Sequence, residues 1–455
     1  MASSTILEPG RETPVLGEYD VVVLGGGPSG ITAAAAAGRS GRTAILIERY
    51  GFLGGAGTVA SVSNFCGLHA NVHGEIKQVV HGLADEILAR LERLGGLNPP
   101  HLSLGGKINA QLYDISAYKV VADQLLAASR VKVLFHAFGV GMCKRSDREI
   151  DALLIESKSG RAAIRGRMFI DCSGDGDLAA WAGAPYEVGD GAGSSYYPSA
   201  KIRINNVDPV RARDAREAIP KLMQEAERQG RRFPRRGAIF RPQKNPIEWS
   251  ANATLIKNPD GSAVSGIDVE QLSYGEVEGR RQCMEVFEFV RSMAPGFENS
   301  YIMEIAPQIG IRETRRVIGG YMLTERDVLE CASFDDSIGV NGWPVEAHIA
   351  DTVVIKFPKI PESRGFNQLP YRMIVPKDVD NLFVAGRCAS MTHDGQASAR
   401  VSGPCFAMGQ AAGTAAHLAL QSGVQPRKLE VSALQRRLEA DGAYLGRDEI
   451  NEGQA

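Results

Sequence analysis

Three glycines near the start of the chain have the spacing that binds a dinucleotide. Gly25, Gly27 and Gly30 form a GxGxxG motif within residues 19–48. The first glycine permits a tight turn, the second lets the backbone approach a pyrophosphate, and the third lets the next helix pack closely on a sheet. Glu48 follows at the spacing of the acid that accepts hydrogen bonds from a ribose diol, where it also repels a 2′-phosphate.

The residues around this motif predict the strand, turn, helix and second strand that must position it. Residues 21–24 are a continuous apolar run, as expected of a parallel strand covered on both faces. Pro28 suits the first turn of a helix, because its missing N–H has no intrahelical partner there. Residues 33–37 are all alanine and give the helix a thin face, and residues 43–47 are the next strand. A turn that binds no ligand is the alternative, and the placement of Glu48 argues against it.

Composition and charge limit the number of domains, the compartment and the kinds of partner that the sequence allows. The 455 residues are 44% hydrophobic, which suffices for a large core and about two to three domains. Lys+Arg 51 against Asp+Glu 53 gives a net charge of -2, so no overall field favours nucleic acid or an anionic membrane surface. The 7 cysteines include no Cys-x-x-Cys, which disfavours a disulfide framework and a redox-active pair. With no signal-peptide pattern and no apolar run approaching ~20 residues, we expect a cytoplasmic protein without membrane or nucleic-acid partners.

Three stretches resemble known FAD flavoproteins. Residues 48–58, ERYGFLGGAGT, resemble the segment after the ribose acid in glutathione-reductase-type FAD-binding flavoproteins, where further glycines wrap the FAD pyrophosphate. Residues 295–328, which contain APQIGIRETRRVIGG, resemble the part of the FAD-dependent oxidoreductase family that crosses from substrate domain to flavin. Residues 368–419 resemble its returning strand and the helix whose N-terminus faces the flavin pyrimidine ring. This resemblance covers most of residues 19–445 and implies FAD as the cofactor.

The predicted fold is α/β, with a Rossmann-like FAD-binding domain built on a parallel sheet and a substrate domain of mainly antiparallel sheet and helices. We assign the FAD-binding domain to residues 17–187 and 367–426, the substrate domain to 188–366, and a C-terminal helix and tail to 427–455. The other predicted elements are helices at 75–94, 115–128 with Asp114 as N-cap, 268–293 and 401–420; strands at 131–135, 152–156, 162–165, 168–171 and 381–385; and a last helix begun by a Ser432–Gln435 capping box. The basic run at 231–236 is interpreted as a solvated face.

The resemblance places FAD contacts along most of the chain. They are Gly25, Gly27, Pro28, Ser29, Gly30, Glu48, Arg49, Gly54, Gly55, Thr58, Val140, Gly174, Asp175, Gly386, Arg387 and Val401. Gly174 and Asp175 lie in a second glycine turn, and a strand-to-helix turn capped by Asp175 explains the same residues. Cys66, His69 and His73 could tether the flavin covalently, but non-covalent binding is the commoner case. No metal site is predicted.

The candidate catalytic residues are His393, Arg312, Arg316 and Arg400. His393 lies in THDGQASARVSG, which resembles the family pattern of a histidine between the returning strand and the helix facing the flavin. Its ordinary pKa of about 6.5 lets it exchange a proton at neutral pH, as hydride removal from an alcohol or amine carbon requires. The arginines would hold a substrate carboxylate or a developing oxyanion. Alternatively, His393 caps its loop together with Asp394, and the arginines pair with Glu304, Glu313 or Asp327.

The predicted activity is that of an FAD-dependent oxidoreductase, a dehydrogenase or oxidase. It would transfer a hydride from a carbon of a small molecule, an alcohol, amine or saturated C–C bond, to flavin N5. Oxygen, a quinone or a protein would accept the electrons, since a single GxGxxG follows a strand and no separate NADPH domain is expected. A reductase of an activated double bond is the alternative. A tRNA-modifying flavoprotein would need a basic surface and an electron-transfer subunit would need cysteine clusters, so both are disfavoured. The sequence identifies neither the substrate nor the oligomeric state, for which a homo-oligomer is one option.

Overall fold

A large, mostly parallel sheet organises the structure, which is a computed structural model describing residues 5–235, 238–349 and 352–447. Within these residues the sheet has seven strands in the order β8-β2-β1-β11-β10-β9, with β22 paired to β11. The strands are β1 (Val15–Leu24), β2 (Ala44–Ile47), β8 (Lys132–Leu134), β9 (Phe138–Ser146), β10 (Glu149–Ser157), β11 (Gly160–Asp171) and β22 (Leu382–Val384). The pairs β8–β2, β2–β1, β1–β11 and β11–β22 are parallel, and β10 is antiparallel to both of its neighbours, β11 and β9. The predicted α/β fold is confirmed.

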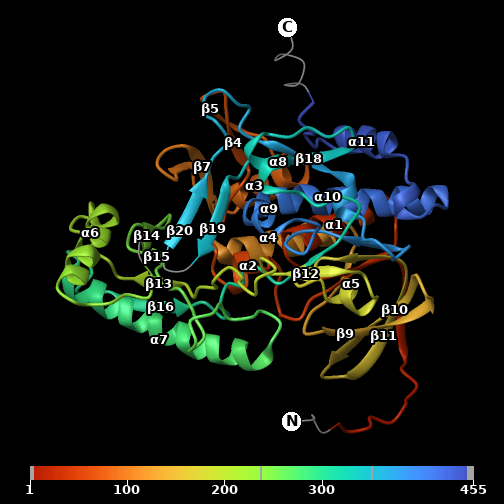
Figure 1. Cartoon of the computed structure of the whole chain (residues 1–455), viewed down its shortest axis with the longest axis horizontal. Coiled ribbons are helices and arrows are strands. Elements are labelled where there is room, and N and C mark those ends of the chain that lie inside the picture. The colour runs from red at the N-terminus through yellow and green to blue at the C-terminus, as the bar shows by residue number, and fades with distance from the viewer. Residues whose placement is uncertain (1–4, 236–237, 350–351, 448–455) are drawn as a thin grey trace.

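Two helices of small residues pack on each other beside this sheet. α1 (Pro28–Arg39) directly follows the glycine turn, and α10 (Ser402–Ser422) lies against it although the two are far apart in sequence (Figure 1). A Cβ at Gly409 would lie 2.1 Å from the carbonyl oxygen of Ser29, and one at Gly413 would lie 2.1 Å from that of Ala33. Only glycine fits at both positions, so the glycines of α10 bring its N-terminal end close to the glycine turn of α1.

A second, antiparallel sheet carries its own core. Its order is β14-β15-β13-β16, formed by β13 (Ile202–Asn205), β14 (Ile239–Pro242), β15 (Trp249–Asn252) and β16 (Tyr301–Ile305). The helices α6 (Ala215–Arg228) and α7 (Val269–Met293), drawn in green in Figure 1, enclose a separate hydrophobic cluster that includes Phe240 and Phe287. Asp268 caps α7 as an acceptor for the N–H of Gln271 at 2.9 Å, so the helix predicted at 268–293 is confirmed. By contrast, Val340 and Leu369 belong to the core of the large sheet.

Smaller sheets and helices complete the structure. They are α2 (Ala56–Val59), β3 (Asn64–Phe65), β4 (His69–Val72), β5 (Glu75–Gln78), α3 (Leu83–Arg93), β6 (His101–Ser103), β7 (Ile108–Leu112), α4 (Ile115–Ala128), α5 (Asp177–Trp181), β12 (Tyr186–Val188), β17 (Arg315–Val317), α8 (Glu325–Leu329), β18 (Ser337–Asn341), β19 (Val345–Ile349), β20 (Thr352–Lys356), β21 (Asn367–Pro370), α9 (His393–Ala399) and α11 (Val431–Ala440), with short 3-10 turns at Tyr371–Ile374 and Pro426–Lys428. Asp114 caps α4 through the N–H of Ala117, as predicted. Across the described ranges, no helix has the length and apolarity to cross a membrane.

Three local predictions are wrong. Residues 75–94 are not one helix: β5 pairs with β4, its residues alternate between exposed and half-buried, and α3 begins only after Gly82 at φ 80. Residues 162–165 and 168–171 form a single strand, because β11 pairs with β10 along its first half and with β22 along its second. The Ser432–Gln435 capping box does not form, since the buried amide of Gln435 donates to the carbonyl oxygens of Asp335 and Ser337.

Candidate active site

A cavity extends from the glycine turn before α1 to the antiparallel sheet. At one end it is lined by Gly25, Gly27, Ser29, Glu48 and other residues of the first strand–turn–helix unit. Lys201 and Arg241, next to β13 and in β14, line the opposite end. The cavity therefore joins the two sheets, with the loop before β17 and the start of α10 as its walls.

The glycine turn leaves room where a dinucleotide phosphate would lie. A Cβ at Gly25, which has a φ of 100, would lie 2.3 Å from the carbonyl oxygen of Cys172, and one at Gly30 would lie 1.8 Å from that of Gly25. A Cβ at Gly27 would meet only the Cα of Gly55, at 3.8 Å, so this position opens into the cavity. The N-cap Gly27 supplies no side chain to α1, which leaves the helix N-terminus available to an anion. The turn thus fits a pyrophosphate.

Glu48 is held in place beside this turn. Its carboxylate accepts hydrogen bonds from the backbone N–H of Gly26 at 2.7 Å and of Tyr50 at 2.9 Å. Burial raises the pKa of the Glu48 carboxyl, while these backbone donors oppose that rise. Arg49 and Tyr50 continue the lining, with the Arg49 guanidinium 5.0 Å from the centre of the Tyr50 ring. A fixed acceptor beside an open phosphate cradle matches the adenosine half of a dinucleotide.

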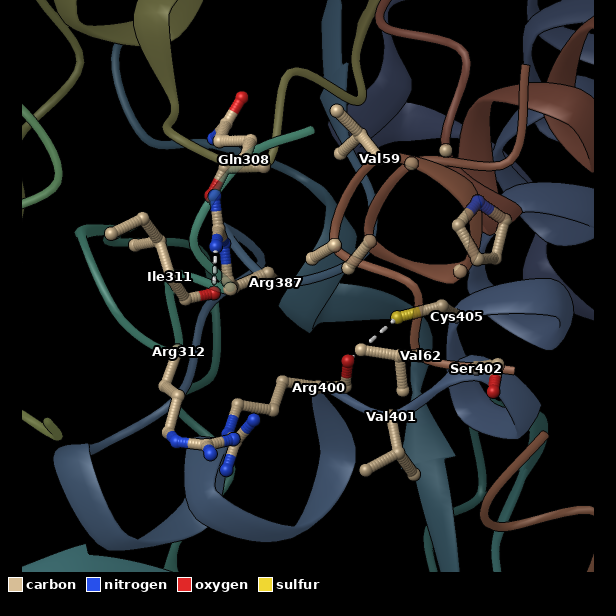
Figure 2. A pocket seen from close by; sticks show the side chains of 18 of the residues that line it. Val59, Val62, Gln308, Ile311, Arg312, Arg387, Arg400, Val401, Ser402 and Cys405 are labelled. Atoms are coloured by element: carbon tan, nitrogen blue, oxygen red, sulfur yellow. Dashed lines mark hydrogen bonds between the residues drawn. The ribbon is translucent and has the colours of Figure 1, made fainter. Parts of the chain in front are cut away.

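Cations gather at the other end of the cavity. We call Lys201, Arg241, Arg312 and Arg400 the cation cluster, since all of them line the cavity. In Figure 2 the guanidinium groups of Arg312 and Arg400 point to the same part of the pocket. Arg312 is anchored by its Nε to the carbonyl oxygen of Tyr197 at 2.9 Å and by Nη2 to Ser199 Oγ at 2.8 Å. No carboxylate among the described residues forms an ion pair with any member of the cluster.

The like charges perturb one another. Burial and the neighbouring Arg400 lower the pKa of Arg312 to about 9, and burial and Arg312 lower the pKa of Lys201 to about 8. Burial also lowers the pKa of Arg241 and of Arg400. All four nevertheless stay largely protonated at neutral pH, because each shift leaves the pKa above 7 or acts on a guanidinium. The cluster is therefore an excess of positive charge within a partly desolvated cavity.

The sequence comparison identifies the cofactor of this cavity. A sequence model of the family described as FAD dependent oxidoreductase matches residues 20–438. The chain belongs to this family. Its cofactor is FAD, and the cradle at Gly27, the open N-terminus of α1 and the acceptor Glu48 fit that cofactor. The match does not test the narrower likeness to glutathione-reductase-type flavoproteins. No curated protein matches the chain.

Several solved structures resemble the chain at low identity. A geranylgeranyl bacteriochlorophyll reductase-like protein from Thermoplasma acidophilum is 13% identical, with a TM-score of 0.47 over 94% of this chain and 84% of that one. The flavin-dependent brominase Bmp2 is 12% identical, with a TM-score of 0.46 over 93% and 84%. BexE is 12% identical, with a TM-score of 0.48 over 89% of this chain and 63% of its own. These likenesses are too distant to indicate a substrate.

Most predicted FAD contacts line the cavity. They are Gly25, Gly27, Pro28, Ser29, Glu48, Arg49, Gly55, Gly174, Arg387 and Val401. Gly30, Gly54, Thr58, Val140, Asp175 and Gly386 lie outside the lining. Some of these residues support the residues around the cavity. Asp175 accepts hydrogen bonds from Arg387 Nη2 at 2.7 Å and from Thr314 Oγ1 at 3.0 Å. Thr58 Oγ1 donates a hydrogen bond to Leu53 O at 2.8 Å. Asp175 caps no helix, since Gly176 holds the N-cap position of α5.

The structure separates the predicted catalytic residues into two groups. Arg312 and Arg400 line the cavity, whereas Arg316 and His393 do not. His393 Nδ1 lies 2.9 Å from Glu313 Oε1, and its ring stacks on Tyr196 with 4.1 Å between centroids. Arg316 pairs with the same Glu313 carboxylate, and its Nε donates to Met391 O at 3.0 Å. Glu313 was a pairing partner in the alternative interpretation, and the acid/base role of His393 stays a prediction.

Sequence patterns did not indicate a histidine and a carboxylate that lie beside the cation cluster. His348 Nε2 is 3.1 Å from Glu346 Oε1, and Trp343 Nε1 donates to Glu346 Oε2 at 2.9 Å. Burial opposes ionisation of Glu346, but His348, Arg400 and Arg312 outweigh it and hold its pKa far below the usual range. Burial and Arg312 lower the pKa of His348 to about 3. At neutral pH the pair is therefore a carboxylate and a neutral imidazole.

Of the residues considered as covalent tethers, Cys66 lines the cavity and His69 and His73 do not. Burial raises the pKa of the Cys66 thiol to about 12, so the thiol is protonated at neutral pH. A protonated thiol is a poor nucleophile. The geometry thus gives Cys66 access to the cofactor cavity without the ionisation that a tethering reaction needs.

Proposed function

We propose that this FAD-dependent oxidoreductase is a dehydrogenase or oxidase that removes a hydride from a carbon of a small organic acid. The observation that supports this proposal is the pair of guanidiniums at Arg312 and Arg400, which share one part of the cavity without a carboxylate partner among the described residues. A substrate carboxylate would supply the missing negative charge and accept hydrogen bonds in the fixed geometry of a guanidinium fork.

The chain itself would orient the substrate. Because Tyr197 O and Ser199 Oγ already hold two nitrogens of Arg312, its side chain cannot swing away when an anion binds. Orientation by a pre-set charged donor lowers the entropic cost of reaching a reactive geometry. Bound FAD supplies the acceptor for the hydride. The protein's remaining tasks are to hold the donor carbon toward the flavin and to take up the proton released with the hydride.

His348 is our candidate for the proton acceptor. Glu346 fixes its Nε2, and no hydrogen-bond partner of Nδ1 occurs among the described residues. A pKa of about 3 makes the imidazole a weak base in the free protein, and the positive charge of Arg312 is one cause. An anionic substrate would offset that charge and bring the pKa of His348 back toward the working pH, so binding would switch on the base.

Anaerobic mixing of the FAD-loaded protein with small hydroxy and amino acids tests the function. Each acid is paired with its primary amide, which keeps the shape and removes the charge. We expect the acids to bleach the flavin at least ~10-fold faster than the amides, because a charged hydrogen-bonded pair contributes about 1.5–3 kcal/mol. Arg312→Gln should remove the preference, whereas Arg213→Gln, at an exposed arginine, should retain it.

Equal reduction by acids and amides would overturn the proposal. Rapid reduction by NADH or NADPH without a substrate would instead favour a reductase that acts on an activated double bond. The electron acceptor would be oxygen, a quinone or another protein. Adding each of these to the reduced protein identifies the one that reoxidises the flavin.

A further inference from the structure

We infer that the substrate carries two anionic groups, one held by Arg312 and Arg400 and the other by Lys201 and Arg241. This inference rests on the proposed function and names the substrate class of the same cavity. The two pairs come from different parts of the chain: Arg312 precedes β17 and Arg400 lies between α9 and α10, while Lys201 precedes β13 and Arg241 lies in β14. A diacid, or an acid that also carries a phosphate or sulfonate, fits this arrangement.

Lys201 and Arg241 line the cavity, and neighbouring side chains hold Arg241 in place. Arg241 is positioned by His101, whose Nε2 lies 3.1 Å from Nη1, and by Ser103 Oγ, 3.1 Å from Nη2. Burial and Arg241 lower the pKa of His101 to about 4, so the imidazole is neutral and leaves the guanidinium charge uncompensated. The Lys201 ammonium lines the same cavity and has no hydrogen-bond partner in the described part of the chain.

Unpaired polar atoms give a second, independent sign of a ligand. Arg241 Nε and Arg400 Nε are buried without hydrogen-bond partners in the described ranges, and so is Asn252 Oδ1, which belongs to a residue lining the cavity. Buried polar groups in folded proteins are nearly always satisfied, because leaving one unpaired is costly. The two arginine donors and the Asn252 acceptor would find partners in a ligand with two anions and an O–H or N–H group.

The cluster differs from several other arginine sites in the described part of this protein. Three buried or half-buried arginines have carboxylate partners, in Arg203–Glu248 at 2.5 Å, Arg316–Glu313, and Arg387–Asp175 at 2.7 Å. The carboxylate of Glu346 raises the pKa of Arg312 and so offsets part of this charge. It can offset one positive charge and not four, and Arg235, which is 3% exposed, adds another cation that lowers the pKa of Arg312. A single substrate carboxylate would leave the excess uncancelled.

FAD is the competing explanation for the second pair. The cradle at Gly27 and the open N-terminus of α1 would hold the phosphates of FAD, and neither includes a residue of β14. The test must still separate the two ligands, so cofactor content is measured in every variant. If Lys201 and Arg241 serve the cofactor, their loss lowers FAD content and leaves the affinity for acids unchanged.

The experiment is calorimetric titration of the FAD-loaded protein with the diacids malonate, succinate, glutarate and adipate. The matched monoacids are propionate, butyrate, valerate and caproate, which resemble the diacids without the second charge. We expect at least one diacid to bind tenfold or more tightly than its partner. Lys201→Gln and Arg241→Gln should abolish that difference by lowering the affinity for the diacid tenfold or more, toward that of its monoacid partner. Arg312→Gln should weaken both kinds of acid, and Arg213→Gln should weaken neither.

Each outcome decides the matter. Diacids that bind no more tightly than monoacids overturn the inference, and so does a Lys201→Gln or Arg241→Gln variant that keeps the full diacid preference. Hydroxy or amino monoacids that reduce the flavin would in that case leave the proposed function standing, whereas a protein that binds none of these acids and is reduced by no hydroxy or amino acid would overturn both. Lys201→Arg and Arg241→Lys guard against misfolding, since they retain the charge and should retain at least part of the preference.

Discussion

Replacing Arg400 with methionine should stabilise the substrate-free protein and at the same time weaken its binding of acids. Toward the residues that the structure describes, the side chain of Arg400 makes one long hydrogen bond, from Nη2 to Glu346 O at 3.4 Å, and its buried Nε has no partner. Its charge lowers the pKa of Arg312, which shows that the two guanidiniums repel each other. Replacement of buried charges by apolar groups of similar volume is often neutral or stabilising by about 1–4 kcal/mol.

The size of the chain sets the expected shift in melting temperature. At an unfolding entropy of about 2.1 cal/mol/K per residue, a protein of this length gains roughly 1 °C per kcal/mol. Arg400→Met should therefore melt about 1–4 °C higher than the parent when both carry FAD and no acid. Its affinity for acids should fall at least ~10-fold, because a charged hydrogen-bonded pair contributes about 1.5–3 kcal/mol.

Differential scanning fluorimetry and calorimetric titration measure the two effects on the same samples. Arg213→Met is the matched control, since Arg213 is exposed, and it should change neither the melting temperature nor the affinity. A fall of the Arg400→Met melting temperature by several degrees would show that Arg400 stabilises the free fold. Unchanged affinity would show that no substrate anion reaches it. Either result would refute the claim that the cation cluster binds a substrate anion and destabilises the protein when no anion is bound.

Three further predictions concern the rest of the cavity. Gly27→Val should give a folded protein without flavin colour, because the backbone there has a φ of -75 and the new side chain would fill the phosphate cradle; full FAD content would contradict the placement. His348→Gln should slow anaerobic flavin reduction ~10²- to 10⁴-fold while His393→Gln retains at least ~10% of the rate, and the sequence-based assignment of His393 predicts the reverse order in stopped-flow absorbance. Glu346 has a depressed pKa in the folded state, so its stabilisation is complete above the usual carboxyl pKa of about 4.5 and shrinks as pH falls below it. The decrease in melting temperature caused by Glu346→Gln should therefore be largest at neutral pH and smaller near pH ~4. A decrease of the same size at every pH would contradict this link between the Glu346 pKa and stability.

The FAD end of the cavity could be predicted because its determinants are local. Gly25, Gly27 and Gly30 act through the backbone of one short turn, and Glu48 follows on the next strand of the same unit. Each requirement is a conformation or a close approach that only certain residue types allow. The same holds for the paired helices, where Gly409 of α10 meets the backbone of α1. Sequence patterns record such constraints directly.

The cation end could not be predicted, because its members have no shared local signal. Within RETRR, Arg312 faces the cavity and Arg316 turns into the buried network around Glu313, and the residue types alone do not distinguish these directions. Lys201 and Arg241 converge only through the pairing of β13 and β14 with β15. The run at 231–236 was interpreted as a solvated face, yet Arg235 is 3% exposed. Which charges are compensated depends on tertiary packing.

The near-neutral composition and the positive cavity are compatible for an electrostatic reason. Lys+Arg 51 and Asp+Glu 53 sum to a net charge of -2, from which we expected no polyanionic partner. That sum governs long-range attraction, because exposed charges are screened over about 8–10 Å by salt. Inside the cavity the dielectric is lower, and the four cations of the cluster outnumber Glu346, the carboxylate that lies beside them. A small anion should therefore bind with an affinity that falls far less with ionic strength than binding to a charged surface would.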